Sequence, residues 1–335
     1  MKLQRMLYPI KLNGKYGYID NTGEICIESK FDYAEEFNGE FAVIGIGESF
    51  GFIDKEGTLI VKAQYDDVYD FNEGMAVVEM ENKKGYVDTM GNLVVSPQFN
   101  EAREFSEGLA AVQSGYKWGY INLKGKMIIE PQFLDAFAFS EGLALVQSGG
   151  KLGYIDKDGN IEIEPTYNFA YGFSEGLAAV LHRDKYGYID KTGHMVIKPT
   201  YYSADYFYDG YAAVELNGKY GFIDTKGKVI IPIKYDSVGN FNEGYAAVAV
   251  GDKYGFIDKE GNELIPIKFD SVDTINEGLI AVKLNGKWGY IDKECNFIIE
   301  PIFDEVSRFI DGAAKVIFDN RTRYIIKNGE YIWKP

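Results

Sequence analysis

The stretch KWGYINLKGKMIIEPQFLDAFAFSEGLALV, residues 117–146, decides the fold because the rest of the chain repeats it. The glycine of its Lys-Trp-Gly motif returns every 34 residues without an insertion or deletion. A fixed period of this length is typical of repeat proteins, whose units bury apolar faces against their neighbours. The anchor glycines are Gly17, Gly51, Gly85, Gly119, Gly153, Gly187, Gly221, Gly255 and Gly289.

The last copy departs from this pattern. One further step of the period reaches Arg323, and Thr322 precedes it where other copies have an aromatic residue. We therefore predict a single array of about ten repeats over residues 1–335, in which the degenerate copy at about 313–335 serves as a cap.

Aromatic residues flank the anchor glycine, which we number position 0. Position +1 is aromatic in all ten copies, whereas position −1 also admits Lys84, Leu152 and Thr322. Positions −1 and +1 point to one face of a strand. We expect +1 to lie in the core and −1 to be partly exposed. The residues at +1 are Tyr18, Phe52, Tyr86, Tyr120, Tyr154, Tyr188, Phe222, Phe256, Tyr290 and Tyr324.

Turn residues bound the strand that carries the glycine. Asp at +3 and Gly at +6, as in Asp156 and Gly159, indicate a hairpin after it. Asn-Gly pairs such as residues 13–14, 217–218 and 285–286 indicate a two-residue type I′ turn before it. With the preceding Leu-Ala-Ala-Val segment, these turns predict a three-stranded meander in each repeat.

The remaining part of the repeat has apolar residues three apart, as in Phe133, Ala136 and Phe139. This spacing predicts a tight helical or irregular connector, and Pro131 is expected to end the third strand. Because propellers usually have four to eight longer, four-stranded blades, ten short units favour an open or superhelical β-solenoid. A closed propeller-like ring is the alternative for this all-β chain.

The consensus KWGYIDxxGxxIIxPxFDxAxxFSEGLAAV resembles the WG repeat, also called the KWG repeat, of bacterial proteins. The literal copies are Lys117–Ile121 and Lys287–Asp292, and the other copies vary the tryptophan. The resemblance covers essentially the whole chain. It implies a repeat protein and brings no catalytic motif with it.

Charge and composition exclude several classes of partner. The chain has 51 acidic and 35 basic residues and a net charge of −16, which repels nucleic acid and anionic membrane surfaces alike. Cys26 and Cys295 lie in distant repeats, so a disulfide is not expected. Without a signal-peptide pattern or an apolar run of about 18 residues, we expect a cytoplasmic protein without membrane insertion. A cell-surface location would follow if the sequence is a fragment of a longer one.

Residues that could carry chemistry are few. His182 and His194 are the only histidines, and both adjoin expected turns. Asp156, Asp158 and Asn160 imitate half of a calcium loop but lack its distal glutamate. The acidic residue that recurs before the second glycine, such as Glu141, is expected to accept hydrogen bonds from turn N–H groups. No nucleophile with a base and an orienting group is evident, so we expect neither an enzyme nor a cofactor or metal site.

These observations predict a non-catalytic scaffold whose extended acidic, aromatic-rich surface binds a protein partner that is basic or extended. The alternative is a module that binds glycan or the cell envelope through exposed aromatic rings. The residues expected to contact a ligand are those of position −1, namely Trp118, Trp288, Tyr186, Tyr220 and Tyr254.

Overall fold

A computed structural model describes residues 6–333, which form 39 β-strands. No helix long and apolar enough to span a membrane occurs in that range. By its internal contacts the chain divides into two compact units, which we describe separately. Unit 1 comprises residues 1–173 with 191–193, and unit 2 comprises residues 174–190 with 194–335.

Unit 1 contains one three-stranded and four four-stranded antiparallel sheets, each in chain order. The strands of the first three sheets are β1 (Tyr8–Leu12), β2 (Lys15–Ile19) and β3 (Ile25–Phe31); β4 (Tyr33–Ala34), β5 (Phe41–Ile46), β6 (Ser49–Asp54) and β7 (Leu59–Tyr65); and β8 (Asp67–Val68), β9 (Met75–Met80), β10 (Lys83–Asp88) and β11 (Leu93–Phe99). Those of the next two are β12 (Glu101–Ala102), β13 (Leu109–Ser114), β14 (Lys117–Asn122) and β15 (Met127–Phe133); and β16 (Asp135–Ser140), β17 (Leu143–Ser148), β18 (Lys151–Ile155) and β19 (Ile161–Tyr167). Strand β20 (Phe169–Ala170) ends this unit.

Unit 2 begins with the antiparallel strands β21 (Leu177–His182), β22 (Lys185–Asp190) and β23 (Met195–Tyr201). Four four-stranded sheets follow. Their strands are β24 (Ser203–Ala204), β25 (Tyr211–Leu216), β26 (Lys219–Asp224) and β27 (Val229–Tyr235); β28 (Ser237–Val238), β29 (Tyr245–Val250), β30 (Lys253–Asp258) and β31 (Glu263–Phe269); β32 (Ser271–Asn276), β33 (Leu279–Leu284), β34 (Lys287–Ile291) and β35 (Phe297–Phe303); and β36 (Glu305–Val306), β37 (Ala313–Phe318), β38 (Arg321–Ile326) and β39 (Tyr331–Trp333).

The predicted three-stranded meander is wrong by one strand. The connector supplies a further first strand, usually of two residues, as where Glu101 and Ala102 pair with Gln113 and Val112. The segment then turns through a Glu-Gly pair in which both residues have positive φ, 53° at Glu107 and 84° at Gly108. A strand of two residues is too short to show alternation, which explains why its spacing suggested a helical or irregular connector.

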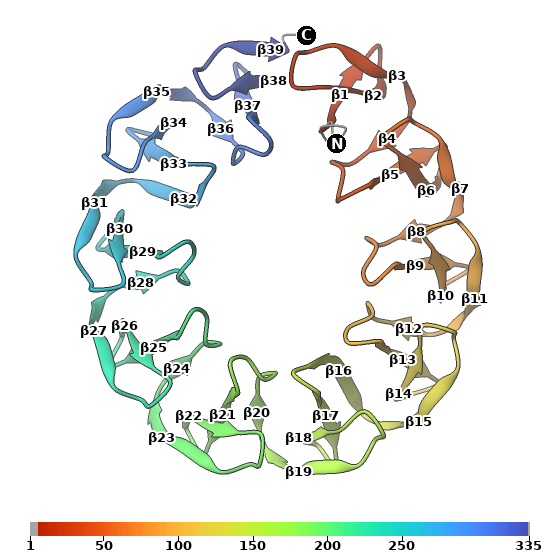
Figure 1. Ribbon diagram of the computed structural model, residues 1–335, viewed down its shortest axis with the longest axis vertical. Coiled ribbons are helices and arrows are strands. Elements are labelled where there is room, and N and C mark those ends of the chain that lie inside the picture. Colours follow the sequence, from red (N-terminus) through yellow and green to blue (C-terminus); the bar gives the residue numbers. More distant parts are fainter. Residues whose placement is uncertain (1–5, 334–335) are drawn as a thin grey trace, which may run out of the picture. The chain divides into compact units, whose positions relative to one another are not determined.

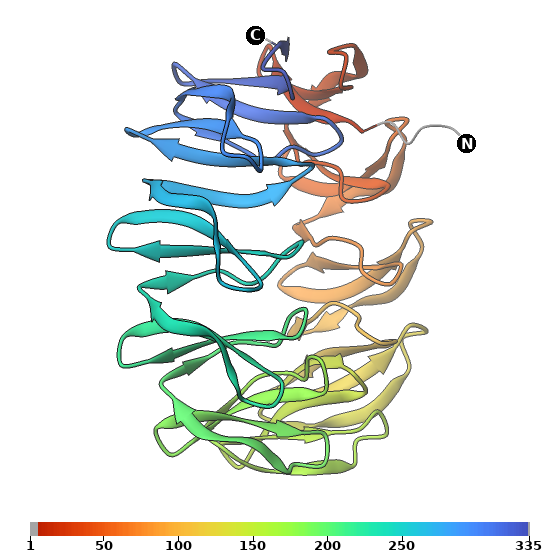
Figure 2. The same cartoon turned by 60° about the vertical axis from the view of Figure 1, so that its left-hand side comes forward.

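The sheets correspond to propeller-type blades, so the expected open β-solenoid is also wrong. In a solenoid, strands of successive repeats would join in continuous sheets, whereas here each repeat forms a separate sheet. Within each unit, Figures 1 and 2 show successive sheets as distinct layers. Their apolar faces meet, since one core cluster combines Tyr86 and Phe99 of one sheet with Phe105, Val112 and Ile121 of the next. The propeller alternative therefore describes the packing correctly.

The anchor glycine allows the last strand of each sheet to approach the strand that carries the glycine. A Cβ atom built on any of the nine glycines would lie only 2.3–2.6 Å from the backbone carbonyl oxygen at position +10. The register shifts at this point: Trp118 pairs with Phe133, but Tyr120 pairs with Ile129. Pro131 lies inside this irregular segment of β15, so the prediction that it ends the strand is wrong. An edge strand at a bulge tolerates proline because no ladder hydrogen bond is lost.

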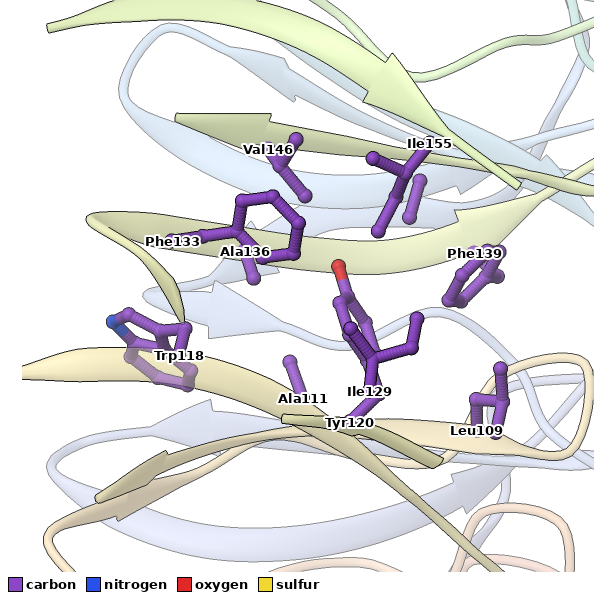
Figure 3. Close-up of a cluster of buried hydrophobic side chains, with 11 residues drawn as sticks. Leu109, Ala111, Trp118, Tyr120, Ile129, Phe133, Ala136, Phe139, Val146 and Ile155 are labelled. Atoms are coloured by element: carbon purple, nitrogen blue, oxygen red, sulfur yellow. The ribbon is translucent and has the colours of Figure 1, made fainter. Parts of the chain in front are cut away.

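The aromatic residue at +1 joins each sheet to the next. The side chain is fully buried, as expected, with an exposed fraction of 0% at Tyr120 and 1% at Phe222. Figure 3 shows Tyr120 among apolar side chains of two adjacent sheets, including Ile129 and Phe139. Its hydroxyl donates a hydrogen bond of 2.8 Å to the carbonyl oxygen of Phe137 in the following repeat. The +1 residue thus combines apolar packing with a polar link between neighbours.

Candidate binding surface

The five residues predicted to contact a ligand do not share one environment. Tyr186, Tyr220, Tyr254 and Trp288 are half-buried, in agreement with the expected partial exposure of position −1. Burial raises the pKa of Tyr186. Trp118 has only 7% of its surface exposed, so its expected exposure is wrong.

Arg103 explains the burial of Trp118. Its guanidinium lies 4.7 Å from the centre of the Trp118 ring and 4.5 Å from that of Phe137. The same group forms an ion pair of 3.0 Å with Asp135. Guanidinium groups stack well on aromatic faces because they are planar and weakly hydrated. Trp118 is therefore a packing residue whose ring is already occupied by a cation of the protein itself.

The recurrent acidic residues that precede the second glycine also have structural partners. The carboxylate of Glu73 accepts hydrogen bonds from the N–H groups of Glu107 and Gly108, at 2.7 and 2.8 Å. Glu107 in turn accepts one from Gly142 and pairs with Lys157 at 3.1 Å. The expected bonds to turn N–H groups exist, but they reach the turn of the next repeat. These carboxylates hold neighbouring sheets together, which is the structural role that the sequence predicted.

The half calcium loop is likewise a repeat hairpin. One carboxylate oxygen of Asp156 accepts the N–H groups of Asp158 and Asn160, and the other accepts the side-chain amide of Asn160. These hydrogen bonds lower the pKa of Asp156, with the amide of Asn160 as the largest contribution. The same pattern recurs at Asp258 and Asn262, so it belongs to the architecture.

Sequence reasoning missed a surface formed by the short first strands of unit 1. We call it the connector strip and define it as residues 32–38, 66–72 and 100–106, which follow β3, β7 and β11, the last strands of three successive sheets. Side-chain hydrogen bonds join its segments, from Asn38 to Asp70 at 3.0 Å and from Asn72 to Glu104 at 3.2 Å. The three segments therefore form one continuous surface within the unit.

The connector strip is strongly acidic. It carries eight carboxylates and one cationic residue, Arg103; the carboxylates are Asp32, Glu35, Glu36, Asp66, Asp67, Asp70, Glu101 and Glu104, all exposed. Lys15 binds Asp32 and Lys84 binds Glu101. The ion pair to Lys15 contributes most to the lowered pKa of Asp32. The other six carboxylates form no ion pair with any residue in the part of the chain that the structure describes.

Two tyrosines lie among these carboxylates. Tyr33 and Tyr69 are 43% and 37% exposed. The Tyr33 hydroxyl donates a hydrogen bond of 2.7 Å to Glu35, which raises the pKa of this tyrosine to about 12. In the two repeats that follow the strip, aromatic residues occupy some of these positions, as at Phe137 and Phe169. The signal was present in the sequence as acidic residues at +15 to +19, three of them in each of the first two repeats and two in the third.

Comparison with known proteins supports the fold and the repeat. A crystal structure described as a eukaryotic initiation factor is similar over 99% of this chain and 96% of its own, at 12% identity and a TM-score of 0.60. A structure of Kluyveromyces lactis Hsv2p matches 66% of this chain and 90% of its own, at 10% identity and a TM-score of 0.39. At these identities the first likeness shows the fold alone. No curated protein matches the sequence significantly.

The model of a protein family described as the WG containing repeat matches nine consecutive segments. The segments are 16–48, 50–83, 85–118, 118–151, 153–186, 186–220, 220–254, 254–288 and 288–321. They include every anchor glycine and nearly the whole chain. The protein therefore belongs to the WG-repeat family.

Proposed function

We propose that the protein is a non-catalytic scaffold that binds a basic, extended segment of a protein partner along the connector strip. The observation that carries this proposal is the set of six exposed carboxylates on three linked sheet edges, none of which has an ion-pair partner among residues 6–333. Such a surface attracts lysine and arginine side chains and selects against acidic partners. An extended segment suits it because its charges recur from sheet to sheet.

Tyr33 and Tyr69 supply a second kind of contact. An arginine or lysine held by a nearby carboxylate can place its cation over an exposed phenol ring, which adds to the ion pair. Lys84 shows this geometry within the protein, because its Nζ atom lies 5.2 Å from the centre of the Tyr69 ring, and Tyr33 is therefore the ring offered to a cation of the partner. The strip thus combines charge with aromatic faces, as interfaces that recognise basic segments require.

The test compares two triple variants, each of which removes three negative charges from unit 1. Glu36→Gln/Asp70→Asn/Glu104→Gln neutralises the strip but retains amide groups for the hydrogen bonds of Asn38 and Asn72. Glu56→Gln/Glu130→Gln/Glu164→Gln neutralises exposed carboxylates elsewhere in unit 1. We expect the strip variant to bind a labelled, extended arginine-rich peptide about tenfold more weakly, which corresponds to about 1.4 kcal/mol.

The control variant should bind the peptide almost as tightly as the natural protein, and added salt should weaken binding in both. Equal weakening by the two triple variants would show that net charge alone attracts the peptide, and it would contradict a specific site. Crosslinking with cell extract, using the same pair of variants, then identifies the natural partner.

A second candidate function is glycan or cell-envelope binding. The four half-buried rings of position −1, at Tyr186, Tyr220, Tyr254 and Trp288, favour it because sugars stack on exposed aromatic faces. Trp288→Ala should abolish retention on purified cell wall if this function is correct. Unchanged retention of Trp288→Ala would count against glycan binding by these rings. If the strip variant loses retention instead, the charges of the connector strip bind the cell wall.

A further inference from the structure

Unit 2 contains a hollow beside the turn that joins β21 to β22. Its volume is about 540 Å³, and it opens to solvent. The turn and the strand residues on either side of it contribute four residues to its lining, and β23 contributes two. The lining residues are His182, Arg183, Asp184, Lys185, Lys198 and Pro199.

The lining is basic in a chain whose net charge is −16. Arg183, Lys185 and Lys198 contribute cationic groups, His182 contributes an imidazole, and Asp184 is the single acid. Corresponding positions of other repeats lack this combination. The repeat of β29–β31 has Val250, Gly251, Asp252, Lys253 and Pro266 there.

Lys185 differs from its equivalents in its partner. In other repeats of unit 2, the lysine at position −2 forms an ion pair with an aspartate at +15, as Lys219 does with Asp236 at 2.5 Å and Lys253 with Asp270 at 2.6 Å. Tyr202 occupies that position here, and the Lys185 ammonium lies over its ring. Among residues 6–333, no carboxylate forms an ion pair with any of the cationic residues of this hollow.

Arg183 provides an independent observation. Its φ angle is +56°, a conformation that L-residues other than asparagine and aspartate adopt only at a cost. The equivalent residues of the next repeats in unit 2 are Asn217, Gly251 and Asn285, which accept positive φ more readily. Eight of the other nine copies have glycine, asparagine or aspartate at this position, and the ninth has Glu81, also at positive φ. Arg183 is the one cation among the ten, and the cost of its conformation supports a role for its side chain.

We propose that this hollow binds a phosphate group, either free or carried by a small phosphomonoester. A guanidinium offers two parallel N–H donors to phosphate oxygens, and two ammonium groups supply the remaining charge. The His182 imidazole can donate a further hydrogen bond. A dianionic phosphate ligand matches the charge of these three cations better than a ligand with a single carboxylate would. This proposal is independent of the connector strip.

The two histidines of the chain make the test direct. His182 lies in the hollow. His194 lies in the turn between β22 and β23, where its backbone N–H donates a hydrogen bond to the Asp190 carboxylate. Inorganic phosphate and O-phosphoserine are titrated separately at constant ionic strength, and the imidazole NMR signals are followed. We expect the His182 signals to shift with saturation while the His194 signals remain in place. Tighter binding of O-phosphoserine than of inorganic phosphate would indicate that the ligand is a phosphomonoester. Tighter binding of inorganic phosphate would indicate that the ligand is free phosphate.

Variants distinguish a site from general attraction. Arg183→Gly should weaken phosphate binding at least tenfold while raising Tm, because it relieves the positive φ. Lys198→Ala should also weaken binding about tenfold. Its matched control is Lys62→Ala, which removes an exposed lysine from the same position of β7, where the turn carries Ile46, Gly47 and Glu48 instead.

The proposal is overturned if both histidines shift alike, if neither shifts, or if Arg183→Gly and Lys198→Ala bind phosphate as the natural protein does. A fall in Tm for Arg183→Gly would show that the arginine stabilises the turn, and it would remove the argument from strain.

Discussion

The segments 117–121 and 287–291 have the same sequence, Lys-Trp-Gly-Tyr-Ile, yet the two tryptophans are in different environments. Trp118 is buried beneath Arg103, whose guanidinium also lies over the Phe137 ring, whereas Trp288 remains half-exposed. Asp273 and Ser307 occupy the repeat positions that correspond to Arg103 and Phe137. The identical pentapeptides therefore show that neighbouring residues of the array, and not the motif, determine whether the ring is available.

The glycines of the two segments should behave alike, because replacing either one places a methyl group against the backbone of the adjacent strand. A Cβ atom would lie 2.3 Å from the Ile129 carbonyl oxygen at Gly119 and 2.5 Å from that of Ile299 at Gly289. We expect Gly119→Ala and Gly289→Ala each to reduce the free energy of unfolding by about 3 kcal/mol, because backbone atoms must move apart. Chemical denaturation followed by fluorescence measures this change.

The control is Gly286→Ala, in a turn where no atom lies within 4 Å of the added methyl group and only the φ of +80° is unfavourable. It should cost about 1 kcal/mol. An equal loss of unfolding free energy for Gly286→Ala and Gly289→Ala would contradict the explanation that the last strand of the sheet approaches the anchor glycine closely.

The tryptophans should separate the two segments. Trp118→Ala should cost about 4 kcal/mol because it leaves a cavity beneath Arg103, and Trp288→Ala about half as much because its ring is partly in water. Denaturation measures both. In the natural protein, acrylamide should quench Trp288 emission more readily than Trp118 emission, as single-tryptophan variants would show.

Arg103→Ala sharpens this comparison, because it should make Trp118 accessible to acrylamide while leaving Trp288 unchanged. The reciprocal change, Asp273→Arg with Ser307→Phe, should protect Trp288. If protection does not follow the arginine and phenylalanine, these two residues do not determine the burial of the ring.

The tyrosines at +1 should give the smallest difference. Their hydroxyls donate to the carbonyl oxygens of Phe137 and Ser307, at 2.8 and 2.6 Å. Tyr120→Phe and Tyr290→Phe should each cost about 1 kcal/mol. Repeats with Phe52, Phe222 or Phe256 at this position already lack the hydroxyl, so the packing tolerates phenylalanine.

The same tyrosines predict a pH dependence. Burial raises the pKa of Tyr120 and of Tyr290, so the folded protein keeps these phenols neutral at a pH where the unfolded chain ionises them. Stability is therefore complete below about pH 10 and falls as the pH rises above that value. Thermal unfolding between neutral and alkaline pH should show a smaller decline in Tm for the double Tyr→Phe variant. An unchanged decline would mean that other groups control alkaline stability.

The period of 34 residues predicted the repeat, the β-rich class, the buried residue at +1 and the turns at Asp156 and at Asn285–Gly286. Each depends on residues close in the sequence. The two-residue first strands were missed because a pair such as Glu101 and Ala102 has no periodicity of its own. The solenoid prediction failed for a related reason, since only hydrogen-bond pairing shows whether strands of successive repeats join one sheet.

The sequence by itself determined where each strand turns and which positions must be glycine or aromatic, because short-range sterics and burial repeat with every copy. Only the tertiary structure decided which aromatic rings are covered and which carboxylates lack a cation. Those outcomes depend on side chains about one repeat apart, such as Arg103 and Asp135, which meet only after adjacent sheets have packed. In Lys-Trp-Gly-Tyr-Ile at 117–121, the sequence therefore specified the strand, and the residues packed against it determined how far the tryptophan ring is exposed.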